Sequence, residues 1–165
     1  MEPPLFSKGE AKMKKTIKIN DKEMTFKSSA ATNILYKKAF GDDILVKLAS
    51  YTKNLKELKD MQAKLAELRK DETKSQEEIL NEMNALMQSD VFLSSQAFTN
   101  ETLPRLAYIM WLEANEKIEE IFSKLNDECY LFWLMEIDQD DLLAVTGEVM
   151  DLWRAGAKTT SKPKN

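Results

Sequence analysis

Apolar and polar residues alternate along residues 14–27, KKTIKINDKEMTFK, which is typical of β-strands. We expect a β-hairpin with a two-residue turn at Asp21-Lys22, although neither residue is the glycine that such turns prefer. This arrangement collects four apolar residues on one face: Ile17, Ile19, Met24 and Phe26. Because an isolated hairpin is only marginally stable in water, this face should pack on the helices that follow.

From Thr32 onward the apolar residues recur at the three- and four-residue steps of a helix. Gly41 should end the first helix, since glycine suits a left-handed C-terminal cap. Asp42 or Asp43 is then suited to cap the start of the next helix and to match its dipole. We interpret this acidic pair as a corner between two helices. A metal or phosphate site would need convergent ligands or a richer glycine loop beside it.

Two apolar stripes follow within residues 43–88. The first comprises Leu48, Tyr51, Leu55, Leu58, Met61 or Gln62, Leu65 and Leu68. The second comprises Ile79, Leu80, Met83, Leu86 and Met87. Between them Ser75 and Glu78 have the spacing of a capping box. An antiparallel helical hairpin is the preferred interpretation, and one long helix is the alternative, because neither Pro nor Gly interrupts the segment.

Residues 89–102 have a loop-like composition in which Phe92 and Phe98 are candidates for burial. Pro104 then occupies a position that the first turn of a helix tolerates. The sequence LPRLAYIMWLEAN predicts a helix that belongs to the core, because apolar residues cover most of its surface.

Two more helices are predicted, one over about residues 116–136 and one that begins at Asp138 and ends at Gly156. The first of them closes with YLFWLM, which is apolar on all sides. Such a segment is either enclosed by its own fold or held for a partner. The sequence alone leaves both alternatives open.

The predicted fold is mainly α, with an N-terminal β-hairpin packed on a compact multi-helix domain. We expect one domain over residues 13–155, since a chain of 165 residues is long enough for a sizeable core. Residues 1–12 are interpreted as a disordered extension or a remnant of cloning, and residues 156–165 as a flexible basic tail.

The net charge of -4 is unevenly distributed. Residues 113–151 hold twelve acidic residues against two lysines, whereas the end of the chain is basic through Arg154, Lys158, Lys162 and Lys164. Neither nucleic-acid binding nor membrane insertion is expected, because the chain has no basic stripe and no run of about 18 apolar residues. The charges instead indicate a solvated acidic surface, with recruitment of a basic partner as the alternative.

The chain has no histidine, and its one cysteine, Cys129, lies on an apolar helical face. The densest acidic cluster, Asp138 to Asp141, lacks the glycine and glutamate spacing of a calcium loop and is interpreted as a helix start. We therefore predict no catalytic, metal-binding or cofactor-binding residues. A function that depends on binding is expected, and the protein is predicted not to be an enzyme.

Three blocks, taken in order, resemble tail assembly chaperones of long-tailed bacteriophages and their prophages. They are TIKINDKEMTFK followed by ILYKKAFGDDIL, then LPRLAYIMWLEAN, then FWLMEIDQDDLL leading to EVMDLW. The resemblance covers most of residues 13–154. Residues 53–95 contain no motif that matches it.

The resemblance implies a factor of the host cytoplasm, absent from the mature virion, that binds the tape measure protein, keeps it soluble and promotes tube polymerisation around it. It also implies contact with the tail tube protein through a frameshift-extended form, and it is compatible with self-association. We predict that Trp133, Met135 and Trp153 border the surface that contacts a partner or a second subunit.

A second function is an alternative. The stripe within residues 48–68 also suits a coiled-coil adaptor or a structural subunit that oligomerises through this helix. The stripe extends over only about three heptads, which is short for an independent coiled coil.

Overall fold

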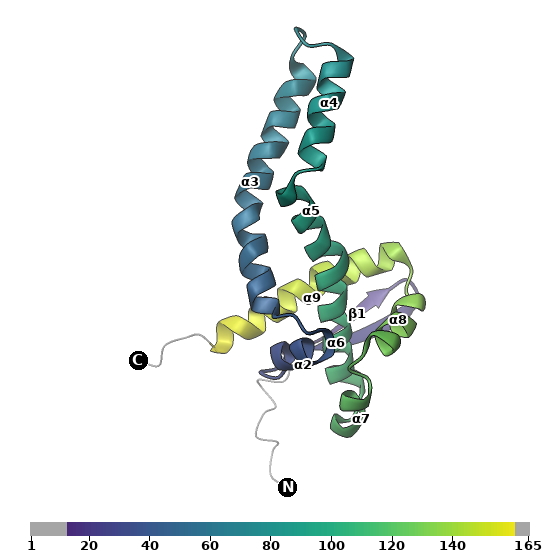
Figure 1. The fold of residues 1–165 in the computed structure, drawn as a ribbon. Coiled ribbons are helices and arrows are strands. Elements are labelled where there is room, and N and C mark those ends of the chain that lie inside the picture. Colours follow the sequence, from purple (N-terminus) through teal and green to yellow (C-terminus); the bar gives the residue numbers. More distant parts are fainter. Residues whose placement is uncertain (1–12, 161–165) are drawn as a thin grey trace. The chain divides into compact units, whose positions relative to one another are not determined.

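The computed structural model describes residues 13–160, in which helices predominate (Figure 1). The chain divides into two compact units. The core unit comprises residues 13–44 and 103–160, and the inserted unit comprises Leu45–Thr102. The predicted fold, mainly helical with an N-terminal β-hairpin packed on helices, is confirmed. The single domain expected over residues 13–155 stays a prediction, and the proposed extension at residues 1–12 lies outside the described residues.

Helix α6 (Leu103–Asn115) is central to the core unit. It packs against strand β2 and against α2, α7, α8 and α9. Eight of its side chains are buried: Leu103, Pro104, Leu106, Ala107, Tyr108, Ile109, Met110 and Leu112. Pro104 lies in the first turn, where no backbone N–H is required. The prediction of a core helix here is confirmed, and burial on most of its sides follows from its nearly continuous apolar sequence.

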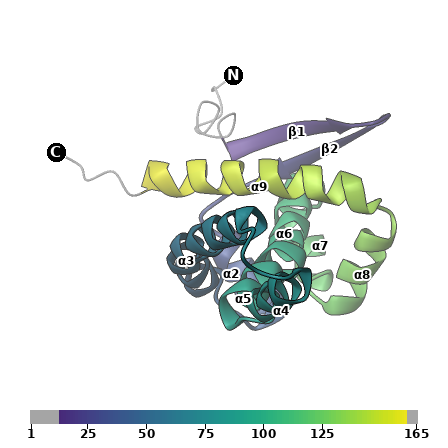
Figure 2. The same cartoon turned by 90° about the horizontal axis from the view of Figure 1, so that it is seen from above.

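Strands β1 (Lys14–Ile19) and β2 (Lys22–Lys27) form an antiparallel hairpin in which Ile17 pairs with Met24. The face that carries these residues packs on α6 and α9 (Figure 2). Ile19 and Phe26 are buried there. The predicted turn at Asp21-Lys22 is wrong by one residue, because the register places it at Asn20-Asp21. Asn20 adopts a φ of 53°, a left-handed conformation that asparagine tolerates better than most residues.

Helix α2 (Thr32–Phe40) ends as predicted at Gly41, which has a φ of 79° and donates its N–H to the carbonyl of Lys37. The Gly41-Asp42-Asp43 segment is thus a corner between helices, since α3 begins at Ile44. Asp42 forms an ion pair with Arg105 of α6 at 3.8 Å, which links this corner to the central helix.

The helix expected over residues 116–136 is two helices, α7 (Ile118–Ser123) and α8 (Asp127–Met135). The side chain of Asn126 caps α8 by accepting the N–H of Cys129 at 2.9 Å, and its amide donates to the carbonyl of Ser123. These local bonds compete with a continuous helix. The prediction of one helix is therefore wrong.

Helix α9 (Gln139–Thr160) crosses α6 and contacts β1 (Figures 1 and 2). It does not end at Gly156 as predicted. A Cβ added at Gly156 would lie 3.0 Å from the hydroxyl of Ser28, so glycine here permits a close approach to the chain after β2. The predicted flexible tail of residues 156–165 is helical as far as Thr160, and its remainder lies outside the described residues.

The inserted unit contains the predicted helical hairpin, formed by α3 (Ile44–Lys70) and α4 (Gln76–Met87), and the alternative of one long helix is excluded (Figure 1). Ser75 and Glu78 form the expected capping box. The apolar stripe of α3 is half-buried at seven positions: Leu48, Tyr51, Leu55, Leu58, Met61, Leu65 and Leu68. Gln62 is exposed, so Met61 is the residue that continues the stripe.

The loop expected at residues 89–102 is also helical: α5 (Asp90–Ala97) is followed by a π-helical segment, η1 (Phe98–Thr102). Ser89 caps α5 by accepting the N–H of Phe92, which overrides the loop-like composition. Phe98 is buried as predicted and stacks on Tyr51 with 4.3 Å between ring centroids, whereas Phe92 is half-buried.

Replacing Ser75 with alanine should lower the free energy of unfolding by about 1 kcal/mol, because it removes the side chain that accepts the N–H of Glu78. Urea denaturation followed by circular dichroism provides the measurement. Ser75→Asp is the matched control and should retain most of the stability, since aspartate also caps helix starts. Equal losses in both variants would contradict a capping role.

Candidate partner-binding surface

Helix α8 exposes an unusual amount of apolar surface in the core unit. Leu131, Phe132 and Met135 are 56%, 63% and 81% exposed, whereas Tyr130 and Trp133 of the same helix are buried. The exposed residues are separated by steps of one and three, so they share one side of the helix. We name these three residues the α8 face. The segment YLFWLM is thus buried on one side of α8 and exposed on the other.

The opposite side of α8 is fixed by aromatic packing. The ring of Trp133 lies 5.5 Å from that of Tyr108 and 6.3 Å from that of Trp111, and the ring of Tyr130 lies 5.3 Å from that of Phe40. Tyr108 donates its hydroxyl to the carbonyl of Lys124 at 2.7 Å, and burial raises its pKa far above the ordinary value. These contacts hold the α8 face in a defined orientation on the core unit.

Two cavities flank the end of α8. One of about 250 Å³ is lined by residues that include Phe132, Trp133 and Cys129, and one of about 210 Å³ lies between the β-turn and the α8–α9 connection. Glu136 lines both. The exposed Phe132 ring therefore stands beside a recess.

Acidic residues border this surface. Glu136, Asp138 and Asp141 line the second cavity, and Asp141 accepts a hydrogen bond from Asn20 at 3.1 Å. In the other direction, Lys124 forms an ion pair with Glu116 at 2.7 Å, and this hydrogen bond raises the pKa of Lys124 and lowers that of Glu116. An apolar face with acidic neighbours is complementary to an amphipathic helix that carries basic residues.

The three residues predicted from the sequence occupy different environments. Met135 is exposed, Trp133 is 7% exposed and lines the first cavity, and Trp153 is 3% exposed. The indole N–H of Trp153 donates to the side-chain oxygen of Asn33 at 3.0 Å, so this residue joins α9 to α2 within the core. Contact with a partner stays a prediction for all three.

Three exposed residues lie outside the set predicted to contact a partner: Leu131 and Phe132, which belong to the α8 face, and Leu143, which is 58% exposed near the start of α9. The sequence contains a signal for the α8 face. Tyr130 and Trp133 are three residues apart, so they share one side of a helix and leave Leu131 and Phe132 on the other. Reading this signal requires a helix that begins at Asp127 after the Asn126 cap, whereas a longer helix over residues 116–136 is expected from the sequence.

The acidic cluster from Asp138 to Asp141 belongs to the start of a helix. Asp138 immediately precedes α9, and its carbonyl accepts the N–H of Leu142, so the acidic cluster is a helix start as predicted. Within residues 13–160, no three His, Cys, Asp or Glu residues are grouped as a metal ion would require. Over the same part of the chain, no helix combines the length and apolar character needed to cross a membrane.

Comparisons of the chain with protein-family models, with curated proteins and with solved structures give no significant match.

Proposed function

We propose that this protein is a tail assembly chaperone of a long-tailed bacteriophage or prophage, and that it binds the tape measure protein without covalent chemistry. The α8 face is the observation that carries the proposal. Three large apolar side chains on one side of one helix are costly to leave in water, and each contributes about 1.5–3 kcal/mol when a partner fully buries it. A partner that is long and helix-rich can cover them with an amphipathic helix.

The distribution of the resembling blocks adds support. Apart from Leu45, all of them lie in the core unit, which also carries the α8 face. The segment without a matching motif, residues 53–95, lies within the inserted unit. The resemblance thus corresponds to one compact unit that carries the proposed binding surface.

Weak contacts repeated along a long client suit this role. A tape measure chain offers many amphipathic helices, so many copies of a chaperone with modest affinity can keep it soluble and still be displaced by tube subunits. The tail tube protein, engaged through a frameshift-extended form, is the second proposed partner. Action in the host cytoplasm and absence from the finished virion belong to the same proposal.

Replacing Phe132 and Met135 together with glutamine should lower the soluble fraction of a co-expressed tape measure protein severalfold. Both side chains are exposed and glutamine is a good helix former, so the fold should be retained. The measurement is the soluble yield of tape measure protein per unit of chaperone, with circular dichroism as the check on folding.

The matched control replaces Ile34 and Val46, which are 69% and 66% exposed and lie on other helices than α8, with glutamine. This variant should solubilise the tape measure protein as well as the wild type does. An equal loss in both variants would indicate general surface hydrophobicity, and full activity of the α8 variant would reject the α8 face as the binding site.

A coiled-coil adaptor that oligomerises through residues 48–68 is the second candidate, and the half-buried stripe of α3 favours it. The two functions make opposite predictions for the α8 variant. An adaptor would retain its assembly state and would have no effect on tape measure solubility, whereas the proposed chaperone loses solubilising activity.

A further inference from the structure

The inserted unit is poorly buried for its length. Among the side chains of Leu45–Thr102, only Phe98 and Thr102 are buried. The stripe of α3 is half-buried throughout, because the facing helices α4 and α5 cover only part of it. One layer of helices normally requires a second layer to complete a core.

Helix α4 also has more apolar surface than its contact with α3 uses. Ile79, Met83 and Leu86 are half-buried, whereas Leu80 and Met87 are 57% and 49% exposed. The latter two are seven residues apart, so they form one row along the side of the helix. This row, named the α4 flank, is suited to receive another helix.

Charge is divided between the two sides of the inserted unit. Helix α3 carries seven basic residues and three acidic ones. The segment from the start of α4 to the end of α5, residues 76–97, carries four acidic residues and no basic one. Each side therefore attracts the opposite side of another molecule of the same protein, and this self-complementarity is what a two-fold symmetric dimer requires.

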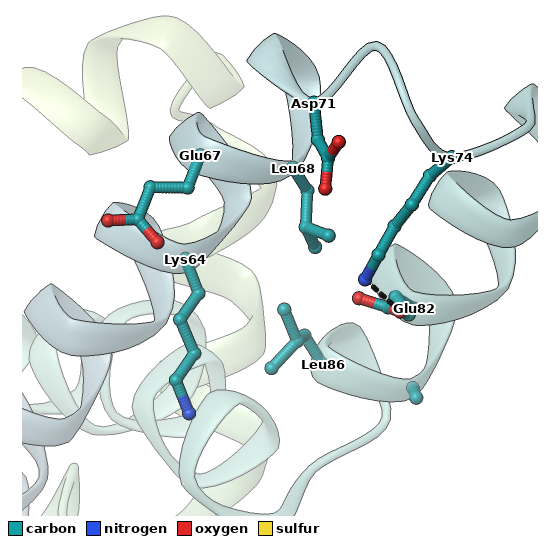
Figure 3. A pocket seen from close by; sticks show the side chains of 8 residues that line it. Lys64, Glu67, Leu68, Asp71, Lys74, Glu82 and Leu86 are labelled. Carbon is teal, nitrogen blue, oxygen red and sulfur yellow. Dashed lines mark hydrogen bonds and ion pairs between the residues drawn. The ribbon is translucent and has the colours of Figure 1, made fainter.

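The end of the hairpin contains a cavity of about 510 Å³ (Figure 3). Leu68 from α3 and Leu86 from α4 form its apolar part, and the ion pair between Lys74 and Glu82 lies at its side. The helices are thus not in close contact here, and apolar carbon is accessible between charged groups.

We propose that the inserted unit is a dimerisation module in which α3 of one copy packs against the α4 flank and α5 of a second copy, giving an antiparallel four-helix arrangement. The contact buries Leu80 and Met87 and pairs the basic helix with the acidic one at two equivalent places. This inference is independent of the proposed chaperone activity, because it concerns a different unit and a different partner.

Sedimentation velocity of the full chain over a range of concentrations tests the dimer. The wild type should show a reversible monomer–dimer equilibrium, and the Leu80→Gln/Met87→Gln variant should raise the dissociation constant at least about tenfold. The Ile34→Gln/Ile118→Gln variant, whose two positions are exposed in the core unit, should dimerise as the wild type does. A monomeric wild type at every concentration, or equal weakening in both variants, would overturn the proposal.

A charge exchange tests the pairing itself. Lys53→Glu/Lys56→Glu removes the net charge of α3, and Glu77→Lys/Asn84→Lys removes that of α4, with all four positions exposed. Each variant alone should dimerise poorly, and an equimolar mixture should form a heterodimer that is tighter than either homodimer, because one of its two helix pairs keeps the wild-type charges. If the mixture dimerises no better than either variant, with both variants folded by circular dichroism, the α4 flank does not pair with α3 of a second copy and the proposal is wrong.

Discussion

Replacing Trp133 with alanine is expected to lower the free energy of unfolding by about 3–5 kcal/mol. The indole is 7% exposed and contacts Tyr108, Trp111 and Tyr130, so truncation leaves a large cavity beneath α8. Urea denaturation followed by far-ultraviolet circular dichroism provides the measurement. This signal does not depend on the tryptophan that is removed.

Two matched variants make the prediction specific. Met135→Ala, two residues away on the same helix and 81% exposed, should change the free energy of unfolding by at most about 0.5 kcal/mol. Trp133→Phe should cost less than Trp133→Ala, because it keeps an aromatic ring and removes an indole N–H that has no hydrogen-bond partner in the described part of the chain. Similar effects of Met135→Ala and Trp133→Ala would contradict the assignment of the two sides of α8.

Helical periodicity predicts faces well, as α3 demonstrates. Every apolar residue of its stripe is half-buried. A spacing of three and four residues determines which side of a helix faces its neighbour. The depth of burial does not follow from the pattern. It depends on how much of the stripe another layer covers, and α4 and α5 cover only part of it.

Element boundaries were harder to predict because they depend on competing bonds. Ser89 and Asn126 begin helices through side-chain acceptance of backbone N–H groups, and neither was recognised in its polar surroundings. Gly156 is predicted to end the last helix, but its role is tertiary, since it allows α9 to approach Ser28. A close contact between residues far apart in the chain leaves no local signal.

The exposed side of α8 also depends on contacts between residues far apart in the chain. Six consecutive apolar residues in YLFWLM identify a helix that is either buried or used for binding, but the sequence does not by itself say which side faces the core. That choice follows from the packing of Tyr130 and Trp133 against α6 and α2. A prediction that grouped Trp133 with Met135 therefore combined one residue from each side of α8.

Replacing Glu113 with alanine is expected to lower the free energy of unfolding by about 2–3 kcal/mol. The carboxylate of Glu113 on α6 accepts the hydroxyl of Thr32 at 2.6 Å and also that of Ser29. Thr32 is fully buried, so truncation of Glu113 leaves its hydroxyl without this acceptor and out of reach of water. Urea denaturation at constant pH measures the loss.

The same residue should make stability depend on pH. Burial raises the pKa of Glu113 above its ordinary value of 4.5, and the hydroxyls of Ser29 and Thr32 only partly oppose this. The folded protein therefore retains a proton that the unfolded chain has released, so the free energy of unfolding should fall as the pH rises from 4.5 through the folded-state pKa.

Glu113→Gln separates the two effects, because glutamine keeps an acceptor oxygen but does not titrate. It should cost less than Glu113→Ala, and the wild type should lose stability relative to Glu113→Gln as the pH rises across that window. Denaturation of both proteins at several pH values between about 4 and 7 gives the difference. Parallel curves would show that Glu113 titrates equally in the folded and unfolded states, which would contradict its burial as a charged acceptor.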